Sequence, residues 1–286
     1  MCARETMKQA FALSLLVLTL AAPVAAQQRP LVTEDPETVG TGNILIEGGF
    51  DAQRDVVYPA SGLTGDLLRL PTVGVSFGFS SILELQVDGG FYNRLNITAI
   101  APAPLSDKLE LTSDRTTDFE DIVVATKIRV VSEGPGRPSF GIRLATKLPT
   151  AGNESGLGLD TMDFSLVGLF GKTVRSVRIV GNFGLGILSD PIEGDRQNDV
   201  LLYGFSIARA LTQGLELVGE VNGRFNTREE RIPPGTETRS AIRTGLRFTE
   251  GTVRVDGGVI FGLTSRDPSF GFTAGVTYVF KGFTLP

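Results

Sequence analysis

The side chains that could do chemistry in this chain are its charged groups, because histidine is absent and cysteine occurs once. The 286 residues include 27 Lys and Arg, 32 Asp and Glu, and no Trp. Without imidazole there is no Ser-His-Asp triad and no histidine metal cluster, and one thiol makes no disulfide framework. We therefore expect no enzymatic activity, no catalytic or metal-binding residue and no cofactor. The formal net charge of −5 also argues against a nucleic-acid partner, which needs a concentrated basic face.

The charged residues recur at every second position within segments that are otherwise apolar. In an extended strand this spacing places all of them on one face. If such strands form a barrel with a polar interior, the charged faces point inward. The candidate lumen-lining residues are then Glu84, Asp88, Lys127, Arg129, Arg143, Lys147, Glu216, Glu220, Arg224, Arg239, Arg243 and Arg247.

Four of these residues form a basic group across a predicted turn at 132–138, and they are Lys127, Arg129, Arg143 and Lys147. Neighbouring antiparallel strands place residues of the same face about 5 Å apart, so the four positive charges would lie close together. Two interpretations stay open. The group is either a stripe that attracts anions or a wall neutralised by Glu84 and Asp121 nearby.

A second group lies on the predicted hairpin formed by 214–226 and 239–248. One plausible register pairs Glu216 with Arg247, Glu220 with Arg243 and Arg224 with Arg239. The first two pairs would be structural ion pairs. The two arginines of the third pair would meet near the loop end, where they could narrow the mouth or hold an acidic loop. A shift of two residues would change every pair.

Period-two alternation predicts twelve strands that position these residues. Several run for nine to twelve residues, which is longer than the five or six usual in soluble proteins. The predicted strands are 42–53, 68–79, 82–94, 119–131, 139–148, 161–171, 177–188, 200–209, 214–226, 239–248, 252–264 and 269–281. Long and short connections alternate between them, and the long ones are 54–67, 95–118, 149–160, 189–199, 227–238 and the shorter 265–268.

Long amphipathic antiparallel strands occur in soluble sandwiches and in membrane barrels. Strands of about ten residues match a tilted crossing of the bilayer, and the even count and the asymmetric connections also favour a barrel. We therefore predict an all-β fold, a transmembrane antiparallel up-and-down β-barrel of about 12 strands, located in the bacterial outer membrane. A secreted sandwich or lipocalin-like barrel is the alternative.

Three parts of the chain are expected. Residues 1–26 have a basic start, an apolar run and a small-residue end, which are typical of a cleaved secretory signal peptide. The one cysteine, Cys2, would leave with it. Residues 27–41 would form a free periplasmic segment or a plug in the lumen, and residues 42–286 would form the outer-membrane barrel.

Three stretches carry a resemblance to a known family. They are RPLVTEDPETVGTGNILIEGGF at 29–50, KLPTAGNESGLGLD at 147–160 and FGFTAGVTYVF at 270–280. The chain resembles the outer-membrane transporter family labelled "putative MetA-pathway of phenol degradation". This resemblance implies a barrel that imports hydrophobic or aromatic compounds, and it brings no catalytic residues.

The favoured function is a porin-like outer-membrane channel or transporter for small solutes, with hydrophobic or aromatic compounds as the implied class. Twelve strands leave a narrow lumen that a segment of the chain could block. The alternative is a closed structural or surface-binding barrel without transport. The expected partners are membrane lipid, outer-membrane glycolipid, the outer-membrane assembly machinery and a small-molecule solute.

Overall fold

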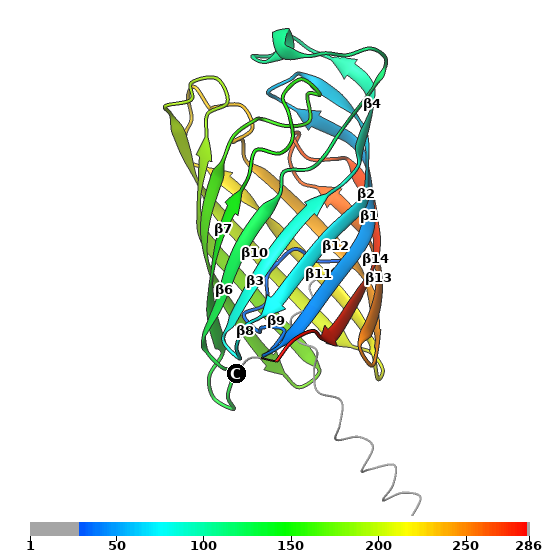
Figure 1. Cartoon of the computed structure of the whole chain (residues 1–286), viewed down its shortest axis with the longest axis vertical. Helices are drawn as coiled ribbons and strands as arrows, with labels where there is room; N and C mark the ends of the chain where they lie inside the picture. The colour runs from blue at the N-terminus through cyan, green and yellow to red at the C-terminus, as the bar shows by residue number, and fades with distance from the viewer. Residues whose placement is uncertain (1–28, 285–286) are drawn as a thin grey trace, which may run out of the picture.

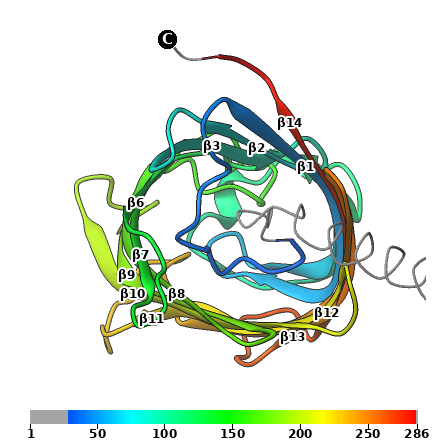
Figure 2. The same cartoon turned by 90° about the horizontal axis from the view of Figure 1, so that it is seen from below.

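Alternating apolar and polar residues fold the chain into one antiparallel sheet that closes on itself (Figure 1, Figure 2). This computed structural model describes residues 29–284, so the predicted signal peptide lies outside the described residues. No helix within 29–284 is long and apolar enough to cross a membrane. The strands are β1 (Asn43–Tyr58), β2 (Leu63–Gly78), β3 (Leu83–Gly90), β4 (Asn93–Ile100), β5 (Arg115–Asp118), β6 (Val123–Val131), β7 (Ser139–Lys147), β8 (Asp163–Val174), β9 (Val177–Ser189), β10 (Gln197–Ala210), β11 (Leu215–Asn226), β12 (Arg239–Glu250), β13 (Val253–Gly262) and β14 (Phe270–Lys281). A short 3-10 helix, η1 (Ser106–Lys108), lies between β4 and β5.

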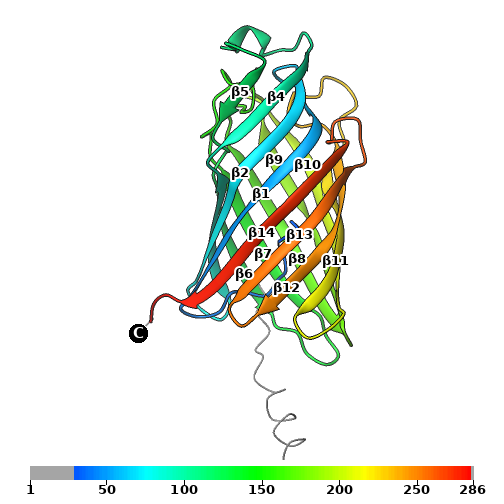
Figure 3. The ribbon, with the colours of Figure 1, turned by 90° about the vertical axis from the view of Figure 1, so that its right-hand side faces the viewer.

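The first strand closes the barrel, because β1 pairs with β14 on one side and with β2 on the other (Figure 3). From β6 to β14 each strand pairs with the next in the sequence. β2 pairs with both β3 and β4, which in turn pair with β6 and β5. β3 with β4, and β5 with β6, therefore act as single wall strands interrupted at 91–92 and 119–122. The wall has twelve strands, which confirms the predicted barrel.

The two faces of the wall differ in polarity, and β12 illustrates this. Ile242, Leu246 and Phe248 are 40%, 47% and 42% exposed on the outer face. Arg243 and Arg247, which alternate with them, lie on the opposite face and pair with carboxylates. Apolar side chains at this exposure would be unfavourable in water, whereas lipid accommodates them. The outer face is therefore built to contact hydrocarbon and the inner face is polar.

Two connections predicted as long loops contain strand residues, which corrects the sequence prediction. The predicted loop 54–67 contains the end of β1 and the start of β2, joined by a turn at 59–62. The predicted loop 95–118 contains most of β4 and all of β5. Val56, Leu63, Leu67 and Leu95 pack into one buried cluster, and this packing stabilises extended structure where Pro, Gly and Asp favoured a loop. The predicted alternation of long and short connections therefore fails at the first one.

The remaining connections divide the barrel into two ends. The turns at 175–176 and 251–252 lie at the same end as the end of β14, and we name this the turn end (Figure 3). The connections at 101–114, 148–162 and 227–238 lie at the other end, which we name the loop end. In outer-membrane barrels the short turns face the periplasm and the long loops face outside.

Candidate functional site

Residues 29–41 run through the interior of the barrel, and we name them the inner segment (Figure 2). Arg29 Nη1 donates a hydrogen bond to Thr72 Oγ1 of β2 over 3.1 Å. Farther along, Leu31 is buried against two side chains of β10 and β11. The chain between residue 29 and β1 therefore contacts the wall on several sides.

The backbone of the inner segment is satisfied by side chains of the wall. An irregular segment inside a barrel must find hydrogen-bond partners for its N–H and C=O groups. Glu220 of β11 accepts hydrogen bonds from the N–H groups of Val32 and Thr33 over distances of 2.8 to 3.1 Å. Asn182 of β9 accepts a bond from the N–H of Glu34 and donates one to its carbonyl oxygen, both over 2.7 Å. The carboxylate of Glu220 thus holds the inner segment as well as lying on the inner face.

The basic group predicted on β6 and β7 is paired with carboxylates. Lys127 is fully buried, with its Nζ 3.1 Å from Glu84 Oε1 and 3.5 Å from Glu34 Oε2. Arg143 Nε lies 3.2 Å from Glu34 Oε1, and its Nη2 lies 3.5 Å from Asp88 Oδ2. Glu34 of the inner segment therefore bridges two cations of the wall.

The turn-end part of the basic group pairs in the same way. Arg129 forms an ion pair with Glu37 of the inner segment. Lys147, at the other end of the group, has its Nζ 3.0 Å from Asp121 Oδ2 and 2.9 Å from Asp163 Oδ2. The four basic side chains are thus neutralised, which favours the second of the two interpretations. Glu84 and Asp121 are among the partners, as in that interpretation, and the inner segment supplies further carboxylates that the sequence analysis did not include.

The firmest link between the inner segment and the wall is bidentate. Arg178 of β9 donates from Nε to Asp35 Oδ2 over 2.8 Å and from Nη2 to Asp35 Oδ1 over 2.7 Å. The same guanidinium also donates from Nη1 to Glu133 Oε2 over 2.6 Å. Two parallel hydrogen bonds to a carboxylate fix both the position and the orientation of Asp35.

The hairpin of β11 and β12 has the register described above, with Glu216 opposite Arg247 and Glu220 opposite Arg243. Arg247 Nε lies 2.7 Å from Glu216 Oε2, which makes a close ion pair. Arg243 Nε lies 3.7 Å from Glu220 Oε1. The second pair is longer because the Glu220 oxygens face the N–H groups of the inner segment.

The two arginines near the loop end bind backbone. Arg224 and Arg239 lie directly opposite each other on β11 and β12. Arg224 Nε donates to the carbonyl oxygen of Glu237 over 2.9 Å, and Arg239 Nη2 donates to that of Val57 over 2.7 Å. They hold the mouth of the barrel together, and no ion pair involves either of them within residues 29–284.

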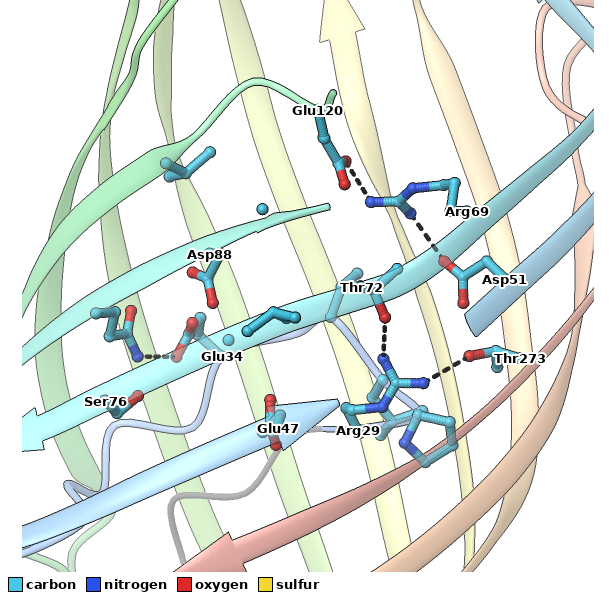
Figure 4. A pocket seen from close by; sticks show the side chains of 18 of the residues that line it. Arg29, Glu34, Glu47, Asp51, Arg69, Thr72, Ser76, Asp88, Glu120 and Thr273 are labelled. Carbon is cyan, nitrogen blue, oxygen red and sulfur yellow. Dashed lines mark hydrogen bonds and ion pairs between the residues drawn. The ribbon is translucent and has the colours of Figure 1, made fainter. Parts of the chain in front are cut away.

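A cavity of about 320 Å³ lies beside the inner segment (Figure 4). Arg69 points across it from β2 and forms ion pairs with Asp51, at 2.8 Å between Nη1 and Oδ2, and with Glu120. Arg29 and Glu47 also line it. The wall of this cavity carries both signs of charge, so the cavity suits polar solutes or water.

A second cavity of about 170 Å³ lies nearer the loop end. Arg243 lines both cavities, whereas Arg239 lines only this one. No group of three or more His, Cys, Asp or Glu side chains within residues 29–284 is arranged to hold a metal ion.

Sequence reasoning missed the acidic partners Glu34, Asp35 and Glu37 and the cavity residue Arg69. A signal for the first three was present, because the stretch TEDPE at 33–37 precedes a barrel whose predicted β6 and β7 faces carry four positive charges. Opposite charges of this kind on one chain are candidates for pairing.

The family profile described as "Putative MetA-pathway of phenol degradation" matches residues 27–280. No protein with a curated description matches the chain. Among solved structures, the chain is similar to the COG4313 outer membrane channel from Pseudomonas putida F1, with a TM-score of 0.62 and 11% identity, over 86% of this chain and 98% of that one. A lower TM-score of 0.47, at 13% identity, relates it to the translocator domain of the autotransporter NalP from Neisseria meningitidis, over 97% and 96% of the two chains. At these identities the likeness concerns the fold.

Proposed function

Since the chain belongs to the MetA-pathway phenol-degradation family and is a bacterial outer-membrane β-barrel in contact with lipid, we propose that it is a channel or transporter for small solutes. The observation that carries this proposal is a polar interior enclosed by an apolar outer wall. Two cavities, of about 320 and 170 Å³, lie within that interior and share Arg243 as a lining residue. These two polar cavities support a route for small molecules through the barrel and thus across the lipid bilayer that surrounds it.

The inner segment is the plug of this channel in our proposal. Its carboxylates pair with Lys127, Arg143 and Arg178, and its backbone bonds to Glu220 on another part of the wall. A segment tied to several strands of a narrow barrel reduces the free cross-section. These contacts are polar and charged, so water and ions can replace them, as a movable plug requires.

The description of the family refers to phenol degradation, and this supports our choice of solute class. We propose hydrophobic or aromatic compounds, and among them the amphipathic ones fit best, because a polar interior penalises a purely apolar solute. Catalysis is not part of the proposal. We also propose contacts with outer-membrane glycolipid, and recognition by the assembly machinery through Tyr278 and Phe280 of β14 or through Phe283 just after it.

A second candidate function is a closed structural or surface-binding barrel without transport. The observation in its favour is the same inner segment, since a permanently tied segment would block the lumen. The two functions differ in whether removing the segment opens a conducting path.

The test is single-channel conductance in planar bilayers, comparing the mature chain from residue 27 with a variant that lacks residues 27–40. We expect stable steps from the mature chain and larger steps from the deletion variant, because the plug no longer narrows the lumen. A Glu193→Gln variant, which changes an exposed pair in the loop at 190–196, should conduct like the unaltered chain. Folded protein that stays silent in both forms would refute the channel, and equal conductance of both forms would refute the plug.

A further inference from the structure

The inner face of β12 carries an arginine at every fourth residue: Arg239, Arg243 and Arg247. At about 3.3 Å per residue, successive members stand about 13 Å apart along the strand. Their partners change along this row. Arg247, nearest the turn end, has a close ion pair with Glu216 at 2.7 Å. At this end of the row the arginine therefore has a carboxylate in direct contact.

Compensation weakens at the middle member. The carboxylate nearest to Arg243 belongs to Glu220, with 3.7 Å between Nε and Oε1. Both oxygens of Glu220 already accept hydrogen bonds from the N–H groups of Val32 and Thr33. Arg243 Nε is buried and donates no hydrogen bond to another atom of residues 29–284. This guanidinium thus has donor capacity that the described chain does not use.

At the third member the carboxylates end. Arg239 takes part in no ion pair within residues 29–284, and its cross-strand neighbour is another cation, Arg224. Its Nη2 binds the carbonyl oxygen of Val57, while its Nε is buried with no hydrogen-bond partner in the described chain. Like charges directly opposite each other are unfavourable, and a bound anion would relieve that repulsion.

Arg239 and Arg243 line the cavity of about 170 Å³, together with the amide of Asn222. A half-turn of that amide presents N–H donors instead of its oxygen. The remaining wall includes the apolar side chains of Ile260 and Pro268. The cavity therefore has donors and positive charge on one side and an apolar surface on another. Its volume is below the roughly 300 to 1,000 Å³ of sites for drug-sized ligands, so it suits a small molecule.

One carboxylate also lines this cavity, and it is committed elsewhere. Asp267 Oδ2 accepts hydrogen bonds from Ser240 N over 2.9 Å, Thr264 N over 3.1 Å and Thr264 Oγ1 over 2.6 Å. These bonds turn Asp267 toward the connection at 263–269. The cavity keeps a net positive lining, since two guanidinium groups face one engaged carboxylate.

We propose that this cavity binds the carboxylate of a small organic acid, with Arg239 and Arg243 as the anion-binding pair. A guanidinium presents a planar fork of donors that matches the two oxygens of a carboxylate. Ile260 and Pro268 cover the apolar body of the acid, which distinguishes it from an inorganic anion. Because Arg243 also lines the larger cavity, the site lies between the loop end and the interior. Onward passage of the acid rests on the proposed channel function, whereas binding does not.

The experiment is isothermal titration calorimetry of the refolded mature chain in detergent micelles, with benzoate and with its uncharged analogue benzamide. We expect benzoate to bind at least about tenfold more tightly, the factor that one charge-assisted hydrogen bond supplies. Arg239→Gln should weaken benzoate binding by a similar factor and leave benzamide unchanged. Arg196→Gln, which removes one positive charge from an exposed loop-end position, is the matched control and should bind like the unaltered chain.

Arg239→Lys keeps the charge but loses the fork, so it should bind benzoate with intermediate affinity, and it also covers the case in which Arg239→Gln does not refold. Equal affinity for benzoate and benzamide would overturn the proposal, as would full benzoate binding by Arg239→Gln or by a folded Arg239→Lys. Conductance recorded on the same preparations separates the two ideas. If benzoate binding depends on Arg239 but the folded barrel does not conduct, the binding site is supported and the channel function is refuted. If the barrel conducts but benzoate binding does not depend on Arg239, the channel function is supported and the binding site is refuted.

Discussion

The bidentate pair between Asp35 and Arg178 should control how often the inner segment leaves the wall. Asp35→Asn removes the charge of the carboxylate while keeping the size of the side chain. Hydrogen bonds to charged groups contribute about 1.5 to 3 kcal/mol, and both side chains are mostly buried, at 12% and 17% exposure. Arg178 keeps Glu133 as a partner, so no guanidinium is left uncompensated. The detached population of the segment should therefore rise about 10- to 150-fold.

A cysteine at position 33 would report that population. Thr33 is 5% exposed and lies in the inner segment, so Thr33→Cys gives a thiol that is covered while the segment is in place. The predicted mature chain from residue 27 has no other cysteine. When opening and closing are fast compared with labelling, the rate of modification by a polar thiol reagent is proportional to the open population. Adding Asp35→Asn to this reporter should raise the labelling rate by the factor given above.

Glu193→Gln in the same reporter background is the control, since it removes an ion pair of exposed side chains at the loop end. It should leave the labelling rate unchanged. If Asp35→Asn also changes the rate by less than about threefold, the pair does not hold the segment, and the account of the plug given above is wrong.

Three further predictions concern the wall. Lys127→Met leaves the buried carboxylate of Glu84 without its closest cation, so it should lower the free energy of unfolding by about 3 to 5 kcal/mol, measured by urea titration in micelles. A loss below about 1 kcal/mol would contradict the role of this pair. Glu216→Arg should destabilise the barrel by about 1.5 to 3 kcal/mol in the same titration, because it breaks the ion pair with Arg247. Adding Arg247→Glu should restore much of the lost stability, and no restoration would mean that the two side chains are not coupled. Burial acts to raise the pKa of Glu133, but hydrogen bonds from neighbouring backbone and cationic groups outweigh it and hold the pKa below its ordinary value of 4.5. The stabilisation by Glu133 should be present above pH 4.5 and disappear as the pH falls through the lowered pKa, and a Glu133→Gln variant that shows the same acid loss would refute this.

The strands were predictable because alternation is a local property. The predicted segments 139–148 and 177–188 differ from β7 and β9 by one residue at one end. For the hairpin of β11 and β12 the alternating charges suggested one register among several, and the structure has that register. The first hairpin was mispredicted, because Leu63 and Leu95 bury against each other only when β2 and β4 are already paired.

The sequence by itself determined the wall strands and the polarity of their two faces, since both follow from residues two positions apart, and the length and even number of the strands predicted the barrel. Only the tertiary structure decided which charges of the inner segment meet which charges of the wall. Asp35 and Arg178 are 143 residues apart, and closure of the sheet between β1 and β14 brings the inner segment within reach of the far wall. Lys127 and Arg143 likewise meet Glu34 of the inner segment, whereas Arg239 forms no ion pair within residues 29–284. Partner choice depends on three-dimensional distance, which no local spacing encodes, and it decides whether a row of arginines becomes a structural wall or a binding site.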